Sequence, residues 1–145
     1  MDWTLEVVCV PVSDIDRAKT FYAEQVGFKI DYDTTFTEEY RVVQLTPPGS
    51  GCSIVIGTGV WSSQPDSSPE LVRMPPGSLR GIQLVVSDIE AARRDLIGNG
   101  VRVSDIQHFE NGTWLDGRGG DWNSFAFFSD LDGNGWVMQE SPARS

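Results

Sequence analysis

The sequence is short of basic residues and of long apolar runs, and each shortage excludes a class of protein. Its 11 lysines and arginines stand against 21 acids, a formal net charge of -10. Such a chain repels a phosphate backbone and offers no basic surface, so we expect no nucleic-acid partner. No apolar run approaches the roughly 18 residues that cross a bilayer, and the first residues lack a secretory signal pattern. We therefore expect a soluble, cytoplasmic protein with no membrane partner.

Cysteine and histidine are also scarce. The two cysteines, Cys9 and Cys52, lie in strand-like apolar runs. A single pair in an intracellular chain is more often two free, buried thiols than a disulfide. The one histidine, His108, has a side chain suited to general base catalysis near neutral pH. No orienting partner is recognisable in the sequence, so the alternative for His108 is a surface or rim position.

What the sequence does contain is a repeated segment. Val12-Ser13-Asp14-Ile15-Asp16 returns as Val86-Ser87-Asp88-Ile89-Glu90, each copy following an apolar run and opening a helical pattern. One supersecondary unit used twice explains this repetition. We predict a single domain over residues 1–145, with a first module over about 1–57, a connecting loop over 58–78 and a second module over about 79–142.

Periodicity predicts the order β-α-β-β-β for each module. In the first module we expect strands over residues 5–10, 28–33, 40–46 and 52–57, with a helix that Ser13 caps and Gly27 ends. In the second we expect strands over residues 81–86, 101–109, 124–129 and 135–140, with a helix opened by the capping box Ser87-x-x-Glu90. Residues 110–123 are predicted to form a loop that carries Trp114 and Trp122, and Trp61 is the large apolar residue of the connecting loop.

Three segments carry a family resemblance. They are V-P-V-S-D-I-D-R-A-K-T-F-Y-x-x-x-V-G-F over residues 10–28, V-V-S-D-I-E-A-A over residues 85–92, and F-F-S-D-L-D-G-N-G-W over residues 127–136. Together they resemble the vicinal-oxygen-chelate superfamily, which contains glyoxalase I, extradiol dioxygenases, fosfomycin-modifying enzymes and bleomycin-resistance proteins. The resemblance implies an α+β fold in which two βαβββ modules pair into a curled mixed sheet enclosing a cleft. Leu131 departs from the pattern, since the family usually has proline there.

The resemblance also implies where a metal would bind. Metal-dependent members of the family have a histidine on the first strand of each module and a glutamate on the last strand. Carried onto this sequence, those positions fall on Val7, Gly81 and Val137, and none of these residues can ligate a metal. We therefore predict no metal and no cofactor in the cleft.

The turn over residues 130–134 begins like a calcium-binding loop, with oxygen-bearing side chains at alternate positions. The twelfth position of such a loop needs a bidentate glutamate, and here it is Ser141. We interpret the segment as a structural turn.

Strand alternation predicts which residues line the cleft. If Val7 and Gly81 mark the inward-facing positions, every second residue along the same strands also faces inward. The predicted ligand-binding residues, with two tryptophans from the loop over 110–123, are Val7, Cys9, Gln83, Val85, Trp114, Trp122, Val137 and Gln139. An apolar lining with two amides suits a neutral or weakly polar organic ligand. The alternative for the tryptophans is core packing, which we expect above all for Trp3 and Trp136.

Two classes of function remain open. The first is binding of a small organic ligand, or its metal-independent conversion, in the manner of bleomycin-resistance proteins. The second is a glyoxalase- or dioxygenase-type enzyme, a lyase or oxidoreductase, with metal ligands at unaligned positions such as His108 and Glu140. Alternation puts Glu140 on the face opposite Val137, where we expect a salt bridge or an exposed position. A structural interaction module with a collapsed cleft is a third interpretation, and a homodimer is expected by analogy with relatives.

Overall fold

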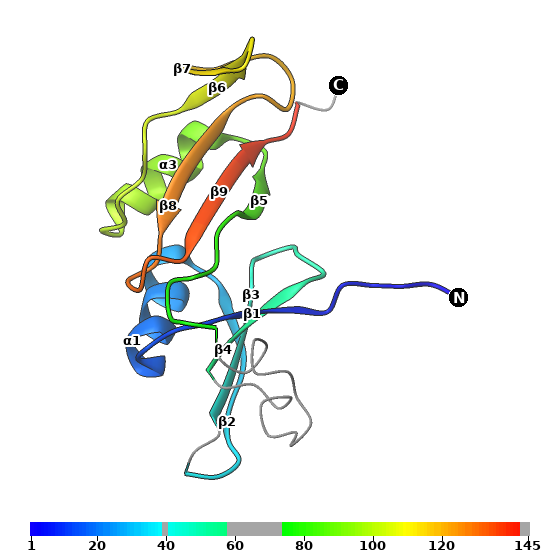
Figure 1. Ribbon diagram of the computed structural model, residues 1–145, viewed down its shortest axis with the longest axis vertical. Helices are drawn as coiled ribbons and strands as arrows, with labels where there is room; N and C mark the ends of the chain where they lie inside the picture. The colour runs from blue at the N-terminus through cyan, green and yellow to red at the C-terminus, as the bar shows by residue number, and fades with distance from the viewer. Residues whose placement is uncertain (39–40, 58–73, 143–145) are drawn as a thin grey trace. The chain divides into compact units, whose positions relative to one another are not determined.

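Each of the two repeats builds its own mixed sheet in the computed structural model (Figure 1). The structure describes residues 1–38, 41–57 and 74–142. The chain divides into two compact units. The first comprises Met1–Leu79 and Leu131–Asn134, and the second comprises Arg80–Asp130 and Gly135–Ser145.

The first unit contains a four-stranded sheet in the order β1-β4-β3-β2. Its strands are β1 (Val7–Val10), β2 (Lys29–Thr35), β3 (Arg41–Thr46) and β4 (Ser53–Gly57). β1 and β4 are parallel, whereas the other neighbours are antiparallel. The helix α1 (Ile15–Thr20) continues directly into the π-helix η1 (Phe21–Val26). Contacts between α1 and β4 place the helix over the sheet, and side chains such as Val43 and Ile56 are fully buried.

The second unit repeats this order with one strand added, β5-β9-β8-β6-β7. Its strands are β5 (Ile82–Val86), β6 (Gln107–Glu110), β7 (Thr113–Asp116), β8 (Phe125–Ser129) and β9 (Gly135–Glu140). β5 and β9 are parallel, as β1 and β4 are, and the helix α3 (Ile89–Gly98) contacts β8 and β9. The predicted α+β fold built from a repeated module is confirmed.

The repeated sequence segment places an aspartate at the start of each helix. Asp14 and Asp88 both have extended backbones and accept hydrogen bonds from the backbone N–H three residues later, at 3.1 and 3.0 Å. The predicted caps Ser13 and Ser87 are therefore wrong by one residue, and the capping box between Ser87 and Glu90 does not form. The physical reason is that a carboxylate is a stronger acceptor for helix N–H groups than a hydroxyl is.

The first helix ends as predicted. Gly27 adopts a left-handed backbone with φ of 93°, and its N–H donates to the Tyr22 carbonyl at 3.1 Å. Glycine suits this position because it has no Cβ to clash in the left-handed region. None of the helices in the described part of the chain has the length and apolar character needed to span a membrane.

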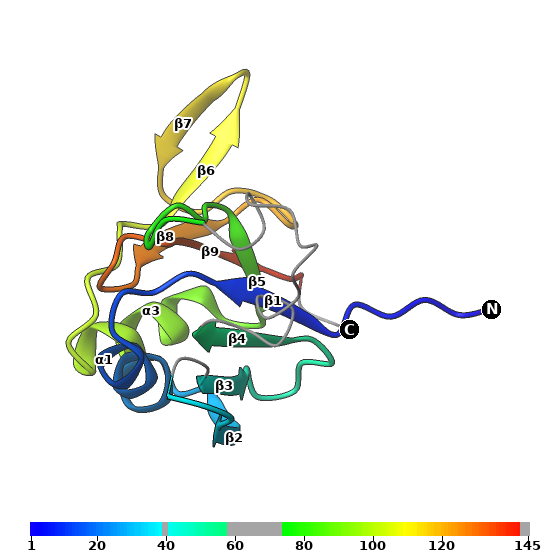
Figure 2. The same ribbon diagram turned by 60° about the horizontal axis from the view of Figure 1, so that its bottom comes forward.

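The second module contains a hairpin that was not predicted from the sequence. The strand predicted over residues 101–109 is limited to β6, with only an isolated bridge at Val103. The predicted loop over 110–123 folds back through Asn111 and Gly112 to form β7 (Figure 2). Both turn residues have left-handed backbones, with φ of 52° and 78°. An Asn-Gly pair is a strong hairpin signal because it tolerates two such residues in succession.

The turn between β8 and β9 belongs to the first unit and is held there by hydrogen bonds. Asn134 is fully buried; its Nδ2 donates to the Pro11 carbonyl at 2.8 Å and its Oδ1 accepts from the Leu79 N–H at 3.1 Å. Asp132 accepts from the hydroxyl of Ser13 at 2.5 Å. Two of the side chains that resemble a calcium loop are thus engaged with protein groups.

The two cysteines are free thiols, which excludes the disulfide alternative. Both Cys9 and Cys52 are half-buried rather than fully buried. Burial raises the pKa of the Cys9 thiol above its ordinary value, so its reactive thiolate is disfavoured near neutral pH.

Candidate functional site

The second sheet has one buried face and one face whose side chains are less buried. On the first face Phe128, Trp136 and Met138 are buried, and the rings of Phe128 and Trp136 stack with centroids 5.9 Å apart. Trp136 is therefore a core residue, as predicted. The alternate residues on the same strands point to the opposite face and are less buried.

The less buried face is rich in aromatic side chains. The register pairs Gln83 with Val137, Val85 with Gln139, and both β9 residues with phenylalanines of β8. We call this surface the aromatic face, and its residues are Gln83, Val85, Phe109, Trp114, Phe125, Phe127, Val137 and Gln139. Val85 is 56% exposed. An exposed cluster of this kind on one sheet face is a candidate ligand surface.

Trp114 is the largest side chain of the aromatic face. Its ring meets the rings of Phe125 and Phe127 nearly edge-on, with both centroids 5.4 Å away, and it tilts against Phe109 at 5.3 Å. The side chain nevertheless remains 45% exposed. Three ring contacts hold the indole in one orientation while leaving much of it open to a ligand.

A short chain of amide hydrogen bonds crosses the same face. Gln83 Nε2 donates to Gln139 Oε1 at 2.5 Å, and Gln139 Nε2 donates to the Trp122 carbonyl at 2.8 Å. Trp122 has a left-handed backbone, with φ of 63°, and its side chain is 51% exposed. The surface thus combines apolar area with a few fixed polar atoms, which is the usual make-up of a small-molecule site.

The predicted ligand-binding residues divide between the two units. The structure brings Gln83, Val85, Trp114, Val137 and Gln139 together on the aromatic face, with Trp122 attached through its carbonyl. The two remaining predicted residues, Val7 and Cys9, lie on β1, where they pair with residues of β4, and both are half-buried. A role for Val7 and Cys9 in ligand binding stays a prediction.

The sequence also predicts a core position for Trp3. Trp3 is 87% exposed, so the prediction that it packs in the core is wrong. It precedes β1, in residues 1–6, which belong to no helix or strand. Trp61 lies outside the described residues.

The three phenylalanines of the aromatic face are absent from the sequence prediction. Alternation along residues 124–129 places Phe125 and Phe127 on one face of their strand. Aligning that strand with the strand of Val137 would have assigned this face to the site. Phe109 could have been found from the Asn111-Gly112 hairpin signal, which pairs it with Trp114.

The two candidate catalytic residues have protein partners of their own. His108 lies opposite Leu115, on the other side of β6 from Phe109; its Nδ1 is 2.9 Å from the Gly117 carbonyl and its Nε2 is 3.3 Å from Glu110. Glu140 binds Arg118 and the backbone at the start of α3. Across the described residues, no group of three or more histidine, cysteine, aspartate or glutamate side chains could hold a metal.

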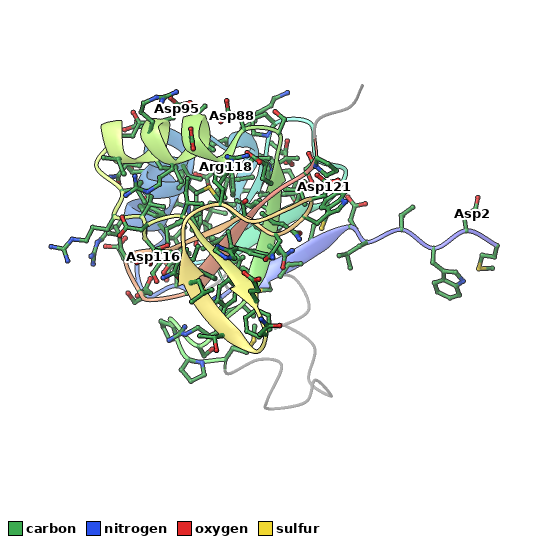
Figure 3. The ribbon with its side chains drawn as sticks, turned by 90° about the horizontal axis from the view of Figure 1, so that it is seen from above. Asp2, Asp88, Asp95, Asp116, Arg118 and Asp121 are labelled. Atoms are coloured by element: carbon green, nitrogen blue, oxygen red, sulfur yellow. The ribbon has the colours of Figure 1, made fainter. Side chains whose placement is uncertain are left out.

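A cavity of about 550 Å³ lies beside Trp122 and the start of α3. Its charged lining residues are Asp88, Glu90, Arg118, Asp121 and Glu140. Figure 3 labels Arg118 together with Asp88 and Asp121. Arg118 forms a two-point ion pair with Glu140 and lies 3.8 Å from Glu90. The expected salt bridge of Glu140 is confirmed. Four acids against one arginine make the cavity acidic.

Glu140 joins β9 to the start of α3. It accepts from the Ile89 N–H at 2.9 Å as well as from Arg118, and its side chain is 14% exposed. Burial by itself would raise the pKa of this carboxyl. The hydrogen bonds from Arg118 and Ile89 outweigh that effect and hold the pKa below its ordinary value of 4.5.

This depressed pKa predicts a pH-dependent contribution to stability. Because the folded state favours the charged carboxylate, Glu140 stabilises the fold above the ordinary glutamate pKa, and the contribution is lost as the pH falls through the lowered one. We expect Glu140→Gln to lower the melting temperature by a few degrees at neutral pH and by progressively less in acid. Thermal melts across pH check this, with Asp95→Asn on α3 as an exposed control. A penalty that stays constant into acid would contradict the expectation.

Comparison with known proteins identifies the family. Residues 4–138 match the family model of the Glyoxalase/Bleomycin resistance protein/Dioxygenase superfamily. The chain belongs to this superfamily. Among solved structures, TnmS3, an antibiotic binding protein from Streptomyces sp. CB03234, is similar at 33% identity over 97% of both chains, with a TM-score of 0.72.

Two further relatives align with most of this chain. A glyoxalase/bleomycin resistance protein/dioxygenase superfamily structure from Sphaerobacter thermophilus DSM 20745 is 26% identical over 97% of this chain and 98% of that one, with a TM-score of 0.71. YetH of Bacillus subtilis (strain 168), an uncharacterized protein, is 25% identical over 92% of this chain and 94% of its own length. The superfamily resemblance inferred from the repeated segments is thereby confirmed.

Proposed function

We propose that this superfamily member binds a flat aromatic organic molecule on the aromatic face and sequesters it. The observation that carries the proposal is the half-exposed Trp114, which is held by edge-to-face contacts with Phe125 and Phe127. The hydrogen-bonded amides of Gln83 and Gln139 lie on the same sheet face. A rigid aromatic surface with a few polar atoms binds planar apolar ligands at a low cost in side-chain entropy. The description of TnmS3 as an antibiotic binding protein supports small-ligand binding by this fold.

The negative charge near the aromatic face indicates which ligands the protein can bind. The cavity beside Trp122 holds four acids and one arginine, and the whole chain has a formal net charge of -10. Anionic ligands are disfavoured by this potential, so we expect neutral or cationic ones.

Binding is tested by calorimetric titration of the purified protein with planar polycyclic aromatics and with saturated ring systems of the same size. We expect measurable affinity for the planar compounds and at least tenfold weaker binding of the saturated ones, which cannot pack flat against the rings. Equal affinity for both sets, or none for either, would contradict the proposal.

We further infer that binding needs no metal. The family's ligand positions carry Val7, Gly81 and Val137, and the described residues offer no cluster of three metal-ligating side chains. Treatment with EDTA followed by dialysis is therefore expected to change the affinity for a planar aromatic by less than about twofold. Loss of binding on chelation, together with stoichiometric metal in the untreated protein, would instead favour the metal-dependent enzyme of this superfamily.

A further inference from the structure

The amide chain on the aromatic face has a fixed direction. The Trp122 carbonyl can only accept a hydrogen bond, so Gln139 must turn its Nε2 toward it. Gln139 then turns Oε1, which can only accept, toward Gln83. Gln83 must therefore donate from its Nε2. One backbone carbonyl thus decides the orientation of both side-chain amides, although their oxygen and nitrogen atoms have nearly the same shape.

The consequence is an oriented acceptor at the end of the chain. Gln83 Oε1 faces away from Gln139 and receives no hydrogen bond from any of the residues that the structure describes. Gln83 is exposed and lies next to Val137, two residues before the 56%-exposed Val85. Without a ligand this oxygen is hydrated; under a flat ligand it loses water and needs a donor, or binding is weakened.

We propose that Gln83 Oε1 selects aromatic ligands that carry a hydroxyl or N–H donor at the edge of the ring system. This specificity rests on the proposed function, because it assumes that the ligand covers the aromatic face. Gln83 is then a specificity-determining residue, and Gln139 is a positioning residue that keeps the acceptor turned outward.

The test compares hydroxypyrene with methoxypyrene, two planar probes of nearly equal area. Both oxygens can accept from the second hydrogen on Gln83 Nε2, but only the hydroxyl can donate to Oε1. The pair therefore isolates the proposed contact. We expect the wild-type protein to bind hydroxypyrene about fivefold more tightly than methoxypyrene, which is the effect of one neutral hydrogen bond. Calorimetry at mildly acidic pH keeps the hydroxyl protonated.

Three variants assign the preference to its atoms. Gln83→Leu removes the acceptor at similar volume and is expected to reduce the preference to below about twofold. Gln139→Leu leaves Gln83 in place but frees it to rotate, and we expect an intermediate preference. Val85→Ala is the matched control: it removes apolar area from the same strand and face, so it should weaken both probes equally and leave the preference unchanged. Thermal melts confirm that each variant is folded.

The outcomes separate the specificity from the binding function. If the wild-type protein binds neither probe, the proposed function fails. If it binds both equally, the function stands and the donor specificity is overturned. If Gln83→Leu keeps the full preference, the acceptor is another atom and the assignment to Gln83 is wrong.

Discussion

Replacing Trp114 by alanine is expected to weaken binding of a planar aromatic by ~30-fold, or about 2 kcal/mol, the size typical of an aromatic anchor at a binding surface. Two losses add in this variant. The ligand loses the largest contact surface on the aromatic face, and Phe125 and Phe127 lose the indole whose ring they hold edge-on. Titration calorimetry measures the effect without depending on tryptophan fluorescence.

Leu115 supplies the matched control for Trp114. It is the next residue on β7, is 43% exposed against 45% for Trp114, and points to the opposite side of the hairpin. We expect Leu115→Ala to leave the affinity within about twofold of wild type, since it lies off the proposed binding surface. Similar losses in the two variants would mean that the hairpin as a whole, rather than the aromatic face, supports binding.

Replacing Asn134 by alanine is expected to destabilise the fold by about 3 kcal/mol, because the Pro11 carbonyl and the Leu79 N–H each lose a hydrogen bond to a buried amide. The Pro11 carbonyl loses a donor at 2.8 Å, and the Leu79 N–H loses its acceptor at 3.1 Å. Asn134 is completely buried, so water cannot replace the amide without a cavity to hold it. For a chain of this length the melting temperature should fall by roughly 10 °C.

Asp132 provides a graded comparison in the same turn. Its hydrogen bonds to Ser13 are exposed to solvent, at 2.5 Å from the hydroxyl and 3.2 Å from the backbone N–H. Because water can satisfy the partners, Asp132→Ala should cost about 1 kcal/mol or less. Urea unfolding curves of both variants rank the two contributions. A larger loss for Asp132→Ala than for Asn134→Ala would show that burial of the Asn134 amide is not the main source of this turn's stability.

Much of the fold follows from local patterns in the sequence. The repeated Val-Ser-Asp-Ile segment marks both helix starts, and strand positions in the first module agree with the structure to within a few residues. The errors arise where two local signals compete. Serine and aspartate are adjacent potential caps, and only the final helix geometry selects Asp14 and Asp88. Between residues 110 and 123, glycine content suggested a loop while Asn111-Gly112 marked a hairpin.

Part of the candidate site is also readable from alternation. Gln83 and Val85 lie two apart on β5, and Val137 and Gln139 lie two apart on β9, so each pair must share a face. Alternation does not tell which strands adjoin. β8 lies beside β9 and turns its phenylalanines toward Trp114. This arrangement depends on pairing between segments that are distant in the sequence.

The sequence by itself determined the superfamily and the repeated module, because these depend on residue types at short spacings. Only the tertiary structure decided how the site is assembled. Gln83 and Gln139 are 56 residues apart, and their hydrogen bond exists because parallel pairing of β5 with β9 brings them together. The direction of that bond is decided in turn by the carbonyl of Trp122, from a loop between other strands. No local pattern encodes a contact that requires three separated segments to meet.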